Sequence, residues 1–332
     1  MATIRDVAKL AGVSVGTVSR YLNGFQLKNK NMQNIATAIK ELNYEENIIA
    51  KGLKTNKSLS IGVVINSLTD VFATSIVTAL ESYLEANNYS IILCDYQQNP
   101  EKLSQKLEFL KTRSVDGVIV FHVEKTLPIF EDYQKSGIPI VTIDCPIEDF
   151  ETDAILVDNV GASFNAVEKL IEMGHQNIGV IAGTQDRYIG RKRLVGYETA
   201  LKAANLPIVN EHIKVADYTK ESGYLKTKEL LKQDQPVTAI YATNYYMTLG
   251  AMQAIFEEKL TIPEDISIIG FDYFELSDIF QPLLSVIKQP VEEIGTVAGE
   301  IILKRIKGDY TDYPMIKKLD TTMLWRDSVK KR

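Results

Sequence analysis

The alternation of short β-rich runs with helical spans, from residue 60 onward, is the feature that most restricts the fold of this chain. Runs such as "SIGVVIN" (60–66), "DGVIVFH" (116–122) and "DISIIGFD" (265–272) are largely apolar, which is typical of strands buried on both faces. Apolar residues between these runs recur at helical spacing. Strands that alternate with helices predict parallel sheets covered by helices on both sides. Seven or more such units exceed one sheet, so we predict an α/β body of two lobes.

The composition of the 332 residues, 45% hydrophobic and 24% charged, is that of a soluble globular protein. There is no apolar run of about 18 residues, the length that a membrane span needs. The opening "MATIRDVAKL" mixes charges with apolar residues, unlike a secretory signal, so we expect a cytoplasmic protein with no membrane partner. Cys94 and Cys145 fall in runs typical of buried strands, and we expect free thiols there rather than a disulfide or a metal site.

The charge of the chain is unevenly distributed. Residues 1–57 hold nine Lys and Arg against four Asp and Glu, a net charge of +5, whereas the whole chain carries −6. The remaining residues therefore carry −11. A basic head on an acidic body indicates that the head, and not the body, meets a polyanion such as DNA.

Three short helices are predicted in the head. The first spans about 6–12 and stops at Gly12, the second spans about 14–22 and is capped by Ser14, and the third spans about 30–42. A helix, a turn containing glycine and a second helix form the helix-turn-helix unit, whose second helix lies in the major groove of DNA. The alternative is a three-helix domain whose polar face binds protein or nothing.

The second helix, in "VSVGTVSRYLNG" (13–24), has little apolar surface and suits contact with a duplex. Arg20 can form a bidentate pair with guanine, and Val15 can contact a thymine methyl group. Short polar side chains that can donate to phosphate oxygens surround them, namely Ser14, Thr17, Ser19 and Asn23.

The segments "TIRDVAKLAGVSVGTVSRYLNG" (3–24) and "ELNYEENIIAKGLK" (41–54) resemble the N-terminal signature of the LacI/GalR family of bacterial transcriptional regulators. The resemblance implies a hinge helix at about 47–55 that pairs across a homodimer and inserts Leu53 into the minor groove. Without it, Leu53 would be read as packing against the body. The DNA-binding residues implied in total are Thr3, Ser14, Val15, Gly16, Thr17, Ser19, Arg20, Asn23, Lys51, Leu53 and Lys54.

The sequence departs from the family pattern where the third helix begins. The family has a serine cap followed by a Thr-Arg pair, whereas this chain has Lys28, Asn31 and Met32. We expect Asn29 or Asn31 to cap the third helix instead.

The resemblance extends to the body and implies a periplasmic-binding-protein-like effector domain of two parallel-sheet lobes at 58–332, after the head at 1–57. "TNKSLS" (55–60) is a polar linker. In the family the chain crosses three times between lobes, and matching motifs place these crossings near 159, 289 and 319. Lobe 1 is then expected at about 60–159 and 290–318, and lobe 2 at about 160–289 and 319–332.

Polar residues at the ends of the predicted strands mark the expected ligand site, because ligands of open α/β sheets bind beyond the carboxyl ends of the strands. Such residues are Asn66, Asp144, Asn244 and Asp272, with Phe72, Arg193 and Tyr218 on neighbouring segments. Carboxylates, an amide and a guanidinium beside aromatic rings suit a polyhydroxylated ring. Asp144 and Asp272 have the alternative role of turn residues.

The family resemblance narrows this set. Arg193 matches the effector-contacting arginine of an R-x-x-G-F/Y motif, Asp272 the aspartate of a G-Y-D motif, and Asn244 the asparagine of an N-D motif. The last motif is altered here, since Tyr245 replaces its aspartate. Phe72, Asp144 and Tyr218 match ligand-lining positions more loosely. The expected effector site is therefore Phe72, Asp144, Arg193, Tyr218, Asn244 and Asp272.

The sequence contains none of the glycine motifs of nucleotide-binding enzymes or serine hydrolases, and its three histidines, His122, His175 and His212, are scattered. We therefore predict no catalytic residues, metal or cofactor. The predicted function is a homodimeric repressor of a carbohydrate-utilisation operon, bound to pseudo-palindromic double-stranded DNA and released by a sugar or sugar phosphate. The alternatives are a corepressor-type regulator that binds a purine or other metabolite, a solute-binding module without a DNA role, and a sugar-processing enzyme with a regulatory head.

Overall fold

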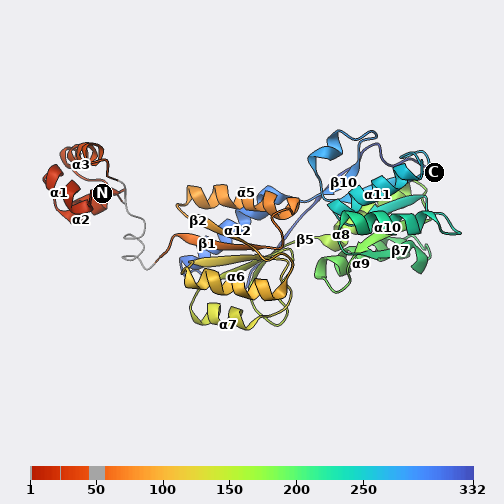
Figure 1. Ribbon diagram of the computed structural model, residues 1–332, viewed down its shortest axis with the longest axis horizontal. Coiled ribbons are helices and arrows are strands. Elements are labelled where there is room, and N and C mark those ends of the chain that lie inside the picture. Colours follow the sequence, from red (N-terminus) through yellow and green to blue (C-terminus); the bar gives the residue numbers. More distant parts are fainter. Residues whose placement is uncertain (1, 23, 45–56) are drawn as a thin grey trace. The chain divides into compact units, whose positions relative to one another are not determined.

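The computed structural model describes residues 2–22, 24–44 and 57–332, and it divides into a head that ends at Leu59 and a body from Ser60 to Arg332 (Figure 1). Each of the two units is described by itself. None of the helices described in these ranges has the length and apolar character to cross a membrane. Cys94 and Cys145 are buried free cysteines, as expected.

The head is a three-helix unit made of α1 (Ile4–Ala11), α2 (Val15–Leu22) and α3 (Asn29–Glu41). Its core contains Val7, Ala8, Ala11, Val18, Ile35 and Ala38. The predicted start and stop signals between α1 and α2 are confirmed. Gly12 adopts a φ of 66°, which glycine tolerates, and the Ser14 hydroxyl accepts the Thr17 N–H at 3.1 Å.

The expected cap of α3 is wrong. Asn29 already lies inside the helix, and so does Asn31, so neither can occupy the extended position that precedes the first turn. Lys28 holds that position, and among the described residues its side chain makes no capping hydrogen bond.

The body contains two six-stranded sheets, which confirms the predicted two-lobed α/β class. The sheet of lobe 1 has the order β11-β5-β4-β3-β1-β2 and consists of β1 (Ser60–Ile65), β2 (Ser90–Asp95), β3 (Gly117–Phe121), β4 (Ile140–Ile143), β5 (Asp153–Val157) and β11 (Ile316–Leu319). The sheet of lobe 2 has the order β12-β10-β9-β8-β6-β7 and consists of β6 (Ile178–Gly183), β7 (Ile213–Ala216), β8 (Ala239–Ala242), β9 (Ser267–Phe271), β10 (Ser285–Lys288) and β12 (Thr322–Leu324). All described pairings are parallel except that of β10 with β12.

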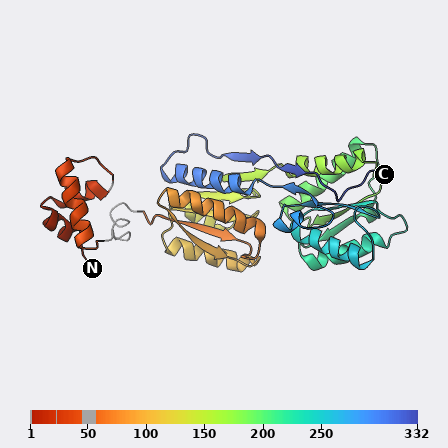
Figure 2. The same ribbon diagram turned by 90° about the horizontal axis from the view of Figure 1, so that it is seen from above.

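Helices cover both faces of each sheet, because the central strands are apolar on both sides (Figures 1 and 2). In lobe 1, α5 (Val71–Ala86) and α12 (Val291–Ile306) pack on one face, and α6 (Pro100–Thr112) and α7 (Pro128–Lys135) on the other. In lobe 2 the corresponding pairs are α8 (Asn159–Glu172) with α9 (Tyr188–Ala203), and α10 (Lys220–Leu231) with α11 (Tyr245–Glu257). Two short 3₁₀ helices span Asn210–His212 and Glu275–Asp278.

The chain passes between the two sheets three times. It leaves the first sheet after Val157, returns after Lys288, and leaves again after Leu319. We expected crossings near 159, 289 and 319, and the three passages lie close to these positions.

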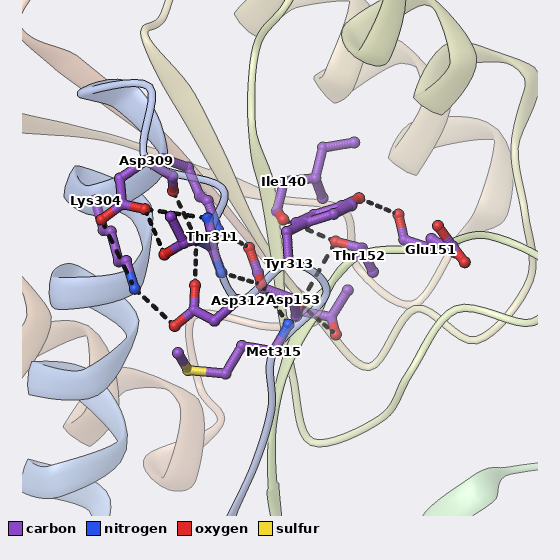
Figure 3. A network of polar contacts seen from close by, with 12 residues as sticks. Ile140, Glu151, Thr152, Asp153, Lys304, Asp309, Thr311, Asp312, Tyr313 and Met315 are labelled. Atoms are coloured by element: carbon purple, nitrogen blue, oxygen red, sulfur yellow. Dashed lines mark hydrogen bonds and ion pairs between the residues drawn. The ribbon is translucent and has the colours of Figure 1, made fainter.

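A buried ion-pair network fixes the end of lobe 1 where α12 meets β5 and β11 (Figure 3). The Arg305 guanidinium donates from Nε and Nη2 to the two carboxylate oxygens of Asp153, at 2.8 and 2.9 Å, and both side chains are fully buried. Asp153 also accepts the Met315 N–H at 2.7 Å, and Arg305 Nη1 donates to Asp312 at 2.7 Å. The pair therefore joins the last turn of α12 to the starts of two neighbouring parallel strands.

Replacing Asp153 by asparagine keeps the size of the side chain but removes the charge that faces Arg305. We expect the free energy of unfolding, measured with urea on the full chain, to fall by about 3–5 kcal/mol, because a buried guanidinium loses its main partner. The control is Glu131→Gln, which breaks an exposed pair with Lys135 and is expected to cost less than about 1 kcal/mol. Equal losses in the two variants would contradict a stabilising role for the buried pair.

Candidate functional site

A cavity of about 910 Å³ lies between the two lobes of the body. Its walls are formed by the loops at the carboxyl ends of the strands and by the helix starts that follow them. All six residues that we expected to contact an effector line this cleft: Phe72, Asp144, Arg193, Tyr218, Asn244 and Asp272. The structure thus gathers in one place side chains that are up to 200 positions apart in the sequence.

The backbone has a positive φ angle at Gln98 and at four further lining residues, each of which follows the end of a strand. His122, Asp144, Tyr218 and Asp272 follow the ends of β3, β4, β7 and β9, with positive φ angles of 56°, 80°, 68° and 77°. Residues other than glycine rarely adopt positive φ angles. Such backbone strain persists where the surrounding structure imposes it, often at functional sites. The turn role that we considered for Asp144 and Asp272 and their place in the cleft are therefore compatible.

An imidazole–carboxylate pair forms part of the wall contributed by lobe 1. His122 Nδ1 lies 2.8 Å from Asp144 Oδ2, and both side chains are almost fully buried. Burial would raise the pKa of Asp144, but His122 and, more weakly, Arg193 lower it below its ordinary value. Asp144 is therefore an ionised hydrogen-bond acceptor inside the cleft.

Arg193 is the central cation of lobe 2 and is only 2% exposed. Its Nε donates to Asn159 Oδ1 at 2.8 Å, and its Nη1 donates to the Thr243 carbonyl at 2.6 Å. The guanidinium carbon lies 3.5 Å from the centre of the Phe271 ring. These contacts fix the guanidinium plane before any ligand binds, which lowers the entropic cost of binding.

Asp272 lies opposite Asp144, at the edge of the second sheet. Its Oδ1 accepts the side-chain amide of Gln289 at 2.6 Å, and its Oδ2 accepts the Tyr245 N–H at 3.3 Å. Burial raises the pKa of Asp272 above its ordinary value, although Arg193 and Gln289 oppose this shift.

The Asn244 side chain forms its hydrogen bonds with other residues of the protein. Its side-chain oxygen accepts the Met247 N–H at 2.9 Å and caps α11, while its amide donates to the Tyr218 carbonyl at 3.3 Å. Tyr245, which replaces the aspartate of the family motif, packs its ring against Phe274 with centroids 4.4 Å apart. Both ends of the Asn244 amide are thus used to hold the loop that carries Tyr218.

Two glycines make room for the Tyr218 ring. A β-carbon at Gly183 would lie 2.1 Å from Tyr218 Cζ, and one at Gly190 would lie 2.8 Å from the hydroxyl. Arg187 lies over the same ring at 5.6 Å. The segment "GTQDRYIG" (183–190) is therefore shaped around this tyrosine.

Four buried polar atoms of cleft residues have no hydrogen-bond partner among the described residues. They are Asn66 Oδ1, His122 Nε2, Tyr218 Oη and Gln289 Oε1. An unpaired buried polar atom costs about 1–3 kcal/mol, so this set indicates a ligand that supplies the missing partners.

The lining residues that were missing from the expected site include Asp70, His122, Arg187 and Gln289. His122 and Gln289 could have been found, because each follows the end of a strand directly, as Asp144 and Asp272 do. Asp70 caps α5 by accepting the Phe72 N–H at 3.0 Å, a role that hides its position in the cleft. Arg187 lies in an arginine-rich segment, and the sequence alone does not show which of its arginines faces the cleft.

Hydrogen bonds join the two lobes at the start of α9. Within the described part of the chain, the side chain of Arg187, the residue before α9, makes no capping hydrogen bond. Glu124 of lobe 1 accepts the Tyr188 N–H at 2.5 Å instead. The other carboxylate oxygen of Glu124 accepts Arg191 Nη2 at 3.1 Å. The first turn of a lobe 2 helix is thus capped from lobe 1.

The head presents part of the expected DNA-binding set at its surface. Val15, Gly16 and Arg20 of α2 are exposed, and Ser19 is half-buried. The hydroxyls of Ser14 and Thr17 hydrogen-bond to each other at 2.8 Å, and the Thr3 side chain caps α1 together with Asp6. The remaining expected positions lie outside the described residues: Asn23, Lys51, Leu53, Lys54 and the hinge helix at about 47–55.

Comparison with known proteins gives two family matches. Residues 3–47 match the model described as bacterial regulatory proteins, lacI family, and residues 58–320 match periplasmic binding proteins and sugar binding domain of LacI family. The chain is 37% identical, over 99% of both chains, to the HTH-type transcriptional repressor PurR of Actinobacillus pleuropneumoniae serotype 3 (strain JL03).

Solved structures agree with these matches. The lac repressor dimer bound to operator and the anti-inducer ONPF is 28% identical, with a TM-score of 0.86 over 99% of both chains. The complex of the transcriptional regulator CelR with cellobiose is also 28% identical, with a TM-score of 0.76 over 99% of this chain and 100% of that one.

Replacing Glu124 by glutamine removes the charge that holds Arg191 and weakens the cap on α9. We expect the lobes to open more often, so that interlobe distances measured by double electron–electron resonance between spin labels on α6 and α9 become longer and more widely distributed. The control is Glu198→Gln, whose carboxylate pairs within α9 with Lys202 and is expected to leave the distances unchanged. An unchanged distribution in the Glu124 variant would show that this contact does not hold the lobes together.

Proposed function

The chain belongs to the LacI family and is a DNA-binding transcriptional repressor, and we propose that a small molecule in the cleft between its lobes controls its affinity for an operator. The four unpaired polar atoms of the cleft carry this proposal. They belong to both lobes, so a ligand that satisfies them binds one closure state of the body better than the other. Such differential binding is what shifts a conformational equilibrium.

We propose a sugar or sugar phosphate as the effector, acting to release the repressor. The unpaired groups include amide oxygens, a hydroxyl and an imidazole nitrogen, arranged on several sides of the cavity beside two carboxylates and Arg193. Hydroxyl groups around a sugar ring both donate and accept, so they can satisfy such a mixed set. Phe72 and Tyr218 supply aromatic surface for the apolar face of the ring.

A purine that acts as corepressor is the second candidate, favoured by the similarity over the full chain to repressors named PurR. The Arg187 guanidinium lines the cleft beside Phe72 and Tyr218. A flat base could lie against the rings while its carbonyl oxygen accepts from an arginine. The two candidates differ in the sign of the response, since a corepressor strengthens operator binding.

For the head, we propose that α2 binds the major groove with Arg20 and Val15 towards the bases. Two heads in a homodimer would then match a pseudo-palindromic operator, which locates the function in the cytoplasm. The body offers exposed apolar side chains for such a dimer, among them Leu225, Phe256 and Ile279 of lobe 2.

Replacing Arg20 by alanine should weaken operator binding by about 1–3 kcal/mol, because one bidentate base contact is lost. Fluorescence anisotropy with operator and with random duplexes measures the change, and effector affinity should stay unaltered. The control is Arg113→Ala, an exposed arginine of the body, which should change neither value. Equal weakening in both variants would show that α2 does not read the bases.

Thermal-shift assays with glucose, ribose, cellobiose, glucose 6-phosphate, hypoxanthine and guanine test the class of effector, since a ligand that binds the folded state raises Tm. We expect a sugar to raise Tm and to weaken operator binding, and Arg193→Ala and Asp272→Asn to abolish both effects while DNA binding persists. Stabilisation by a purine base alone, with tighter operator binding, would replace the sugar by the second candidate. An unchanged response in both variants would contradict the cleft as the effector site.

A further inference from the structure

His122 differs from the other two histidines of the chain in that it faces the cleft. His175 uses both ring nitrogens within lobe 2, Nδ1 towards Thr238 Oγ1 at 2.8 Å and Nε2 towards the Lys330 carbonyl at 3.0 Å. His212 is buried beside β7 and does not line the cavity. His122 lines the cavity directly after β3, with its side chain 11% exposed.

The orientation of the His122 ring is fixed on one side and open on the other. The Asp144 carboxylate accepts a hydrogen bond from His122 Nδ1. This nitrogen therefore carries a proton in both the neutral and the charged ring. Nε2 is buried and has no hydrogen-bond partner among the described residues. The nearest carboxylate oxygen, Asp70 Oδ2, is 4.0 Å away, which is too long for a hydrogen bond.

The charges around the ring favour its protonated form. Asp144 approaches from the edge of β4 and Asp70 from the start of α5, whereas Arg187 from the start of α9 opposes them. Arg193 acts on the Asp144 carboxylate. Burial alone would lower the pKa of His122, but the two carboxylates raise it above the ordinary 6.5.

The partners of Asp70 explain why it does not take the Nε2 proton. Its Oδ1 accepts the N–H groups of Phe72 and Ala73, at 3.0 and 3.3 Å, and its Oδ2 accepts the Asn66 amide at 2.9 Å. These bonds hold the carboxylate at the helix start, out of reach of the imidazole. The charge of Asp70 therefore stabilises the imidazolium while the Nε2–H group stays available.

We propose that His122 is a specificity-determining residue of the cleft, which presents a charged Nε2–H donor to an acceptor atom of the effector. The proposal rests on the proposed function of the cleft and names a requirement on the ligand. The atom that meets Nε2 must be an acceptor, such as a hydroxyl, carbonyl or phosphoryl oxygen or an unprotonated ring nitrogen. A ligand that offers only a donor or an apolar group there would leave the buried Nε2–H donor without a partner.

The proposal gives effector binding a defined pH dependence. A ligand that accepts from the imidazolium raises the pKa of His122 in the complex. The affinity is then constant below the pKa of the unliganded protein and falls, by at most tenfold per pH unit, between that pKa and the pKa of the complex. A loss of affinity on acidification would have the opposite sign.

Nuclear magnetic resonance on the full chain, labelled at its three histidines, tests the proposal without relying on activity. His122→Gln identifies the signal of His122. We expect the unliganded protein to show a His122 pKa above 6.5 with the proton of the neutral form on Nδ1. The compound of the panel that raises Tm should increase this pKa further. The signals of His175 and His212 serve as internal controls and should not respond to the compound.

Calorimetric titration of the same compound between pH 5.5 and 9 gives the second measurement. We expect Kd to rise with pH by the factor that the pKa difference requires, and the His122→Gln variant to bind more weakly at pH 6 with no pH dependence in this range. A His122 pKa that is unchanged by the compound, or a variant that keeps the pH profile of the original chain, would overturn the proposal.

The failure of this proposal and that of the proposed function are distinguishable. If no compound of the panel binds, the effector classes proposed for the cleft are wrong. The titration of the unliganded protein still tests the proposal for His122. A pKa above 6.5 supports the charged donor, and a pKa at or below 6.5 overturns it.

Discussion

The carboxyl edges of two parallel sheets line the same cleft, and the rest of the body is organised around this arrangement. In a parallel sheet every strand ends at the same edge, so the loops that leave the strands bring together residues that are distant in the sequence. His122 and Asp144 leave the first sheet in this way, and Asp272 leaves the second. The buried pair of Arg305 and Asp153 holds the opposite end of the first sheet, where β5 and β11 begin.

The two lobes repeat one plan, which explains why each contributes one carboxylate to the cleft. Their sheets have the same order of strands, and only the direction of the last member differs, since β11 is parallel to its neighbour and β12 is antiparallel. Asp144 donates its N–H to Ile155 of the next strand at 2.9 Å, and Asp272 donates its N–H to Ile287 at 2.9 Å. The same hydrogen bond, at equivalent places, fixes the same left-handed backbone in both lobes. A ligand between the lobes therefore meets chemically similar groups on two sides.

The sequence was informative wherever local rules and strand ends decide the structure. The stop at Gly12, the cap at Ser14 and the two-lobed class follow from propensity and periodicity, and the strand-end rule led to Asp144 and Asp272. The predicted cap of α3 was wrong because both asparagines lie inside the helix, and the residue before it, Lys28, makes no side-chain capping bond to the described residues. Contacts between residues distant in the sequence could not be predicted. No local pattern shows that Glu124 of one lobe caps a helix of the other, or that His122 meets Asp144 across two strands.

The three passages of the chain between the sheets have a mechanical consequence. The first runs from β5 to α8, the second from β10 to α12, and the third from β11 to β12. The strands at their ends, β5 and β11 in lobe 1 and β10 and β12 in lobe 2, lie at one edge of each sheet, so the three connections together form a hinge. Sliding or twisting one lobe over the other would strain three covalent segments at once, whereas rotation about this hinge bends each of them slightly. The body is therefore built for a single opening and closing movement.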